Sequence, residues 1–218
     1  EDNQTGAYNT AVGYNSLANT TNNYNTAVGY ASLVSTVGGG GNTAMGHESL
    51  YANASTSNNT GIGYQAGFYT TGASNTYVGH SAGKGASGAE ANNVGVGKDA
   101  LLAVTDGGAN TSIGKDSSKA ITDGHNNVAI GNNALETSTS VGYVVAIGDD
   151  AMKSGNATSA ADGTIAIGGS ALSALTSGAE NVAVGYQALQ DMTTGSSNVA
   201  VGYQSQKDLN HADADCNV

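Results

Sequence analysis

The segment Asn9-Thr10-Ala11-Val12-Gly13-Tyr14 is the first copy of a short motif that returns along almost the whole chain. Alignment on its glycine yields twelve copies in 218 residues, at steps of 16 to 20 residues. A repeat of about 17 residues is too short for a helical hairpin and too long for one strand, but it suits one coil of a β-solenoid. The aligned glycines are Gly13, Gly29, Gly46, Gly63, Gly79, Gly97, Gly114, Gly131, Gly148, Gly168, Gly185 and Gly202.

The residues before each glycine have the pattern of a short strand. The position one residue before the glycine is aliphatic in every copy and the position three before it is β-branched, as in Thr10 and Val12. The residue between them is usually Ala or Gly. This alternation predicts a strand whose β-branched side faces the interior and whose small side faces outward. The glycine then turns the corner, because it accepts backbone angles that other residues resist.

A second conserved feature of the repeat follows each glycine. The third residue after it is always Ala or Ser, as in Ser16 and Ala134, and the next is usually Leu, as in Leu17. We expect the Leu to point inward and the Ala/Ser column to form a close contact with neighbouring chains. Each coil would then enclose only two or three modest side chains, which is little for the ordering cost of some 17 residues. The sequence therefore predicts that further burial comes from other copies of the chain.

Composition excludes several classes of protein. The chain has one Phe, no Trp and no Pro, so a monomeric globule with a large core is a poor fit. Its net charge of −11, without any Lys/Arg cluster, argues against a nucleic-acid partner. No run approaches the roughly 18 apolar residues of a membrane span, so we expect no membrane insertion.

Two forms of the motif carry a resemblance to known families. The core Asn181-Val182-Ala183-Val184-Gly185 resembles the head repeat of YadA-like trimeric autotransporter adhesins. The longer form from Asn9 to Leu17 is similar to repeats of phage tail fibres and of surface fibres of predatory bacteria. The resemblance implies an all-β, left-handed parallel β-roll of about twelve coils, assembled as a homotrimer. It divides the chain into a lead-in (1–8), the roll (9–206) and a tail or start of a next module (207–218).

The resemblance also implies a function in attachment. We expect an extracellular adhesin segment, on a cell surface or a virion fibre, that binds a glycan or protein receptor. The alternative is a passive shaft that spaces a separate binding tip. An ice-binding solenoid is disfavoured because Val or Ile interrupts the Thr column, as at Val94 and Ile165, and because the column is expected to point inward. A polysaccharide-cleaving fibre is disfavoured because its carboxylates, such as Glu48 and Glu136, are scattered among coils. We expect no enzymatic activity and no cofactor.

Two places are candidates for contact with a receptor. The first is the aromatic group Tyr64, Phe68 and Tyr69, because exposed rings on a polar rod are typical of contact surfaces. The second is the 20-residue step from Gly148 to Gly168, because a solenoid accommodates extra residues in exposed loops. The candidate residues of this insertion are Asn156, Thr158 and Ser159.

The histidines do not predict a metal site. None has Cys, Asp or Glu at ligand spacing. His47 and His80 occupy the position after the glycine that elsewhere holds Tyr, as at Tyr14 and Tyr64, so we expect them to be members of an aromatic ladder. Asp213 and Asp215 lack the glycine-rich nonapeptide pattern of calcium-binding rolls.

Overall fold

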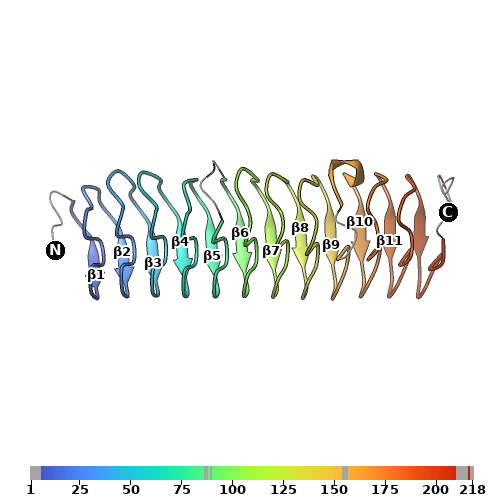
Figure 1. The fold of residues 1–218 in the computed structure, drawn as a ribbon, viewed down its shortest axis with the longest axis horizontal. Coiled ribbons are helices and arrows are strands. Elements are labelled where there is room, and N and C mark those ends of the chain that lie inside the picture. Colours follow the sequence, from blue (N-terminus) through green and yellow to red (C-terminus); the bar gives the residue numbers. More distant parts are fainter. Residues whose placement is uncertain (1–5, 86–87, 89, 154–156, 210–215, 217–218) are drawn as a thin grey trace.

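The computed structural model describes residues 6–85, 88, 90–153, 157–209 and 216. The chain is an all-β parallel solenoid, as the repeat predicts. In the described residues, twelve three-residue strands form one parallel sheet in chain order, so that eleven turns separate the first from the last. The coils follow one another along a single axis, and all strands point the same way (Figure 1). The strands are β1 (Thr10–Val12), β2 (Thr26–Val28), β3 (Thr43–Met45), β4 (Thr60–Ile62), β5 (Thr76–Val78), β6 (Val94–Val96), β7 (Thr111–Ile113), β8 (Val128–Ile130), β9 (Val145–Ile147), β10 (Ile165–Ile167), β11 (Val182–Val184) and β12 (Val199–Val201).

The repeat is kept in register from coil to coil. Thr10 pairs with Thr26 and Val12 with Val28, and the same columns stay paired up to β12. The glycine after each strand is required by this stacking. Gly29 has φ +132°, and a Cβ there would lie 2.4 Å from the carbonyl oxygen of Gly46. No side chain fits at that distance, so every coil keeps a glycine at this corner.

The strands face the opposite way from the sequence prediction. The middle residue of most strands is fully buried, as in Ala27 and Ala44, whereas the flanking residues Thr26 and Val28 are partly exposed. The prediction that the β-branched columns point inward is therefore wrong. Interior space explains the difference: the coil is narrow, so a small residue usually occupies the inside of the strand and the larger side chains lie outside. Tyr77 in β5 is the exception, and its ring fits because Gly67 and Gly83 beside it carry no side chains.

The Ala/Ser column also differs from its predicted role. Ser32, Ala134 and Ala171 are fully buried within the coil of a single chain. The column is therefore not the contact between chains that the sequence suggested. The Leu that follows does point inward, as predicted, because Leu33 and Leu135 are fully buried.

The interior holds more than the two or three side chains expected per coil. The seventh residue after each glycine is buried in most described coils, as in Thr36, Ile121 and Met192. The residue before each strand from β2 to β12 is buried too, and it is mostly Asn. Each coil thus buries up to five positions. The expectation that the interior is too small, and that other copies of the chain must supply further burial, therefore loses its basis.

We call the asparagines before β1 to β8 the asparagine ladder; Asn9 is partly buried and the others are fully buried. The Oδ1 atom of each accepts a hydrogen bond from the backbone N–H one coil further on, for example from Asn59 to Asn42 over 2.9 Å. The last rung receives the N–H of Val144. The ladder consists of Asn9, Asn25, Asn42, Asn59, Asn75, Asn93, Asn110 and Asn127.

Candidate functional site

An aromatic ladder runs along one corner of the first five coils. It consists of the residues that follow the strand-ending glycines, and the coil repeat places their rings about one coil apart. Ring centroids are 5.6 Å apart for Tyr14 and Tyr30, 4.9 Å for Tyr30 and His47, 5.2 Å for His47 and Tyr64, and 5.0 Å for Tyr64 and His80. The expectation that both histidines belong to the ladder is confirmed. The rings are exposed at their edges, 45% for Tyr64, so they present a narrow aromatic strip to solvent.

The same corner becomes charged in the middle coils. Lys115 and Lys119 both bond the carboxylate of Asp116. Burial raises the pKa of Asp116, but the hydrogen bonds from the two lysines outweigh burial, and the pKa lies below its ordinary value. Rings return at Tyr186 and Tyr203, whose centroids are 5.6 Å apart. The aromatic corner is therefore divided into two ends.

Phe68 and Tyr69 lie in a second ring cluster. Phe68 stacks on Tyr51 with centroids 4.8 Å apart, meets Tyr69 edge-on at 4.5 Å, and has the Lys84 ammonium 6.0 Å from its centroid. Phe68 is half-buried and Tyr69 is 44% exposed. Among the described residues no ring contact joins this cluster to Tyr64, so the three predicted aromatic residues belong to two separate surfaces.

The insertion between β9 and β10 forms a wider loop than its neighbours (Figure 1). It contains a one-turn 3₁₀ helix, η1 (Ser159–Ala161), and Thr158 and Ser159 are exposed as predicted. The loop is attached to the coils on both sides: Gly142 N–H donates to Asp162 Oδ1 over 2.7 Å, and Gly178 N–H donates to the carbonyl of Ala160 over 2.8 Å. Asn156 lies outside the described residues.

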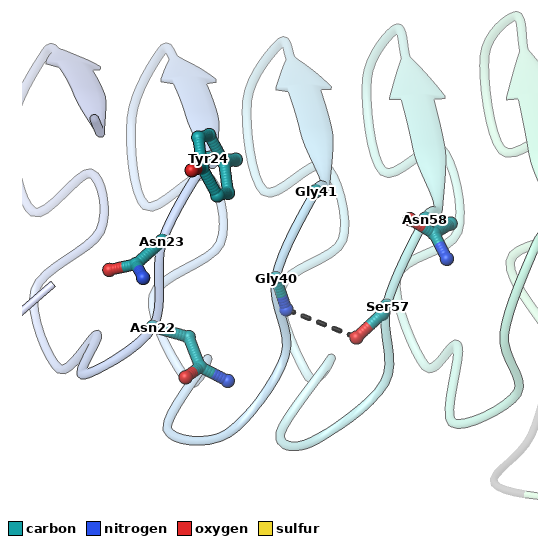
Figure 2. Close-up of a pocket in the computed structure, with 7 residues that line it drawn as sticks. All are labelled: Asn22, Asn23, Tyr24, Gly40, Gly41, Ser57 and Asn58. Carbon is teal, nitrogen blue, oxygen red and sulfur yellow. Dashed lines mark hydrogen bonds between the residues drawn. The ribbon is translucent and has the colours of Figure 1, made fainter. Parts of the chain in front are cut away.

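A hollow that the sequence interpretation missed lies on the turns before β2, β3 and β4 (Figure 2). It has a volume of about 410 Å³. Its walls are Asn23 and Tyr24 on one coil and Ser57 and Asn58 on the next but one, and its floor is the glycine pair 40–41 between them. One signal could have revealed it: no other coil has glycine at both positions of this corner. We call it the corner notch.

One buried acid lies inside the rod near β5. Glu90 is 2% exposed and the hydroxyl of Tyr77 is fully buried. Glu90 Oε1 accepts the Thr71 N–H over 3.3 Å, while Oε2 has no hydrogen-bond partner in the described part of the chain. Burial, with a smaller effect of Asp106, raises the pKa of Glu90 to about 7. Burial, with a smaller effect of Glu90, also raises the pKa of Tyr77. The pair is enclosed, so it is not open to a substrate.

The described residues contain no group of three His, Cys, Asp or Glu side chains placed to hold a metal ion. Within the same residues, no helix has the length and apolarity needed to cross a membrane. Asp213 and Asp215 lie outside the described residues.

The outward strand face bears on the ice-binding alternative. Thr10, Thr26 and Thr43 point outward, so one of the two grounds for disfavouring that function was wrong. The other ground stands, because the column changes to Val or Ile in half of the coils, as at Val94 and Ile165.

The fold defines the chain as a parallel β-solenoid protein. No protein-family model, curated protein or solved structure matches it in the comparisons.

Proposed function

We propose that the chain is a segment of a homotrimeric surface fibre, wound as a left-handed roll, that attaches to a glycan or protein receptor outside the cell. The resemblance of the repeat to trimeric adhesins and to phage and bacterial fibres supports this function. We propose no enzymatic activity and no cofactor for the segment.

The observation that carries the proposal is the uncovered outer side of the sheet, which we call the outward strand face. It is formed by the first and third residues of all twelve strands, and none of these residues is charged. Met45 and Ile113 on this face are 47% and 39% exposed in the single chain. The third residues form an unbroken aliphatic column and the first residues are Thr, Val or Ile, and an exposed stripe of this kind is typical of surfaces that associate. We expect the partner to be another copy of the same chain, because the side chains on two outward strand faces repeat at the same spacing and can pack against each other.

The assembly is tested by the mass of the purified protein in solution. Light scattering is expected to give about three times the 21.4 kDa of one chain. Ile113→Asp places a charge on the outward strand face without touching the interior, so we expect monomers that keep a β-type circular dichroism spectrum. Thr158→Asp on the exposed insertion is the matched control and should stay trimeric. A wild-type monomer that is fully folded would contradict the trimer.

Attachment is tested separately, because a shaft could also be trimeric. Beads coated with the segment are expected to bind target cells, and Tyr30→Ala with Tyr64→Ala should reduce that binding by shortening the aromatic strip. The substitution Thr122→Ala on a distant turn is the control. If coated beads bind no cells from a broad panel, the segment is the passive shaft.

A further inference from the structure

We propose that the corner notch binds one neutral hexopyranose ring, stacked on the free face of Tyr24. This inference rests on the proposed function, since it names the class of ligand that such a fibre would contact.

The notch is a vacancy in an ordered stack. The corner residues Tyr8, Tyr24, Gly41 and Asn58 occupy the same position in successive coils, with φ of 59°, 63°, 70° and 62°. Tyr8 and Tyr24 stack with centroids 5.2 Å apart and planes 5° apart. The next place in the stack is Gly41, which has no side chain (Figure 2), so among the described residues no ring lies against the second face of Tyr24.

The size of this vacancy suits a single six-membered ring. Successive coils stand about 4.8 Å apart, so the corner positions of Tyr24 and Asn58 are separated by roughly two such steps. A pyranose ring stacks on an aromatic face through its apolar C–H side, as an aromatic ring would through its own face. The ligand would thus continue the stack that Tyr8 and Tyr24 begin.

Hydrogen-bonding groups surround the vacancy as a sugar requires. Asn58 is exposed, its side-chain amide bonds to no residue in the described part of the chain, and its Oδ1 lies 2.8 Å from where a Cβ of Gly41 would be. Ser57 Oγ accepts the Gly40 N–H over 3.1 Å, which leaves its own hydroxyl proton for a ligand. Asn23 also lines the hollow, but its Oδ1 accepts the Ala7 N–H of the preceding coil over 2.7 Å and its side chain points away from Gly40 and Gly41 (Figure 2).

The near absence of charged residues around the notch favours a neutral ligand. Between residues 3 and 83 the sequence has a single Asp, Glu, Lys or Arg, which is Glu48. A charged sugar, a phosphate or a metal ion would find no opposite charge in the notch. An aromatic ring with a few amides and hydroxyls is the arrangement that orients a polyol in a shallow pocket.

The chain offers a substitution that fills the notch without disturbing the fold. Gly41→Tyr would complete the stack, and its backbone conformation is one that Tyr8, Tyr24 and Tyr143 already adopt at this corner. The closest atom to the added Cβ would be the Oδ1 at the end of the flexible Asn58 side chain, and the Asn58 backbone nitrogen lies at an ordinary contact distance of 3.9 Å. Ala109→Tyr is the matched control, because Ala109 has the same corner position and φ of 58° in a coil far from the notch.

Saturation-transfer NMR on the full segment tests the inference. The probes are the methyl pyranosides of glucose, galactose, mannose and N-acetylglucosamine, with N-acetyltyrosinamide as a non-sugar ring. We expect saturation transfer to at least one pyranoside, at least a tenfold weaker signal in Gly41→Tyr and in Tyr24→Ala, and an unchanged signal in Ala109→Tyr. No pyranoside signal in the wild type, an equal signal in Gly41→Tyr, or a signal from N-acetyltyrosinamide alone would overturn it.

The mass and cell attachment of the same proteins separate this inference from the proposed function. A trimer that attaches to cells but shows no notch-dependent pyranoside signal overturns the sugar site and leaves the fibre function standing. A notch-dependent signal from a segment that attaches to no cell supports the sugar site and contradicts the adhesin.

Discussion

Gly131 shows at the scale of one residue why the repeat cannot lose its glycine. Its φ is +139°, and a Cβ would lie 2.3 Å from the carbonyl oxygen of Gly148. Gly131→Ala is expected to lower the free energy of unfolding by at least about 2 kcal/mol, since it adds backbone strain to a backbone clash. Urea denaturation measures the effect. The control is Gly38→Ala, whose Cβ has its nearest neighbour at 3.7 Å, and equal midpoints for the two variants would refute this explanation.

The asparagine ladder leads to a second residue-scale prediction. Asn110 accepts from the backbone and side-chain nitrogens of Asn127, both over 3.0 Å, and donates to the carbonyl of Gly124 over 2.8 Å. Asn110→Ala leaves these buried groups unpaired, so we expect a loss of about 2 to 4 kcal/mol in unfolding free energy. Thermal melting checks it against Asn132→Ala, which alters an exposed amide. A loss no larger than that of the control would show that water replaces the ladder.

At the scale of one element, a buried acid in the coil around β5 makes the free energy of unfolding depend on pH. The pKa of Glu90 is about 7 in the fold and 4.5 as a free side chain, so the folded chain binds the proton more tightly. The stabilisation by the proton on Glu90 is complete below about pH 4.5 and is lost as pH rises from there through 7. Above that pH the unfolding free energy no longer changes through this group. The unfolding free energy from urea denaturation should be higher at pH 5 than at pH 8, by on the order of 2 kcal/mol.

Glu90→Gln removes the titration while keeping the size of the side chain. The difference between pH 5 and pH 8 should then largely disappear. Asp162→Asn, on the surface loop, is the control and should keep it. An unchanged pH dependence in Glu90→Gln would assign the effect to another group.

At the scale of the whole molecule, each strand in the described part of the chain contacts only the strands of the adjacent coils, so whole coils should be removable. Deletion of residues 98–131 joins Gly97 to Asn132 and brings β6 beside β9. Asn93 then stands where Asn127 stood and can receive the Val144 N–H. We expect a folded rod about 10 Å shorter by small-angle scattering, because two coil spacings are lost.

An out-of-phase deletion is the control for this experiment. Removal of residues 98–123 cuts one and a half coils and joins Gly97 to Gly124, so the columns no longer align. This variant is expected to lose its β-type circular dichroism or to aggregate. A shortened rod of equal stability from both deletions would contradict the in-register stacking.

The sequence by itself determined the solenoid, the number of strands and where each begins and ends. The glycine column marks every corner, and the alternation around it marks every strand, because both are local requirements of a short turn and a pleated backbone. The exposed position of Thr158 and Ser159 and the stacking of His47 in the aromatic ladder were predictable for the same reason. The number of residues between successive glycines predicts the exposed insertion, and the residue type after each glycine predicts the aromatic ladder.

Only the tertiary structure decided which side of each strand is inside. The alternation of residue types predicts that the two faces of a strand differ, but it does not predict which face fits inside a narrow coil. In the structure the small residue Ala27 lies inside, and the larger Thr26 and Val28 lie outside. The same packing turned the Ala/Ser column inward and placed Tyr64 and Phe68 on separate surfaces. The corner notch arises from three coils together, since it depends on what Tyr24 and Asn58 leave open above Gly41. The contacts that form the notch join residues 17 or more apart, and no single repeat contains them.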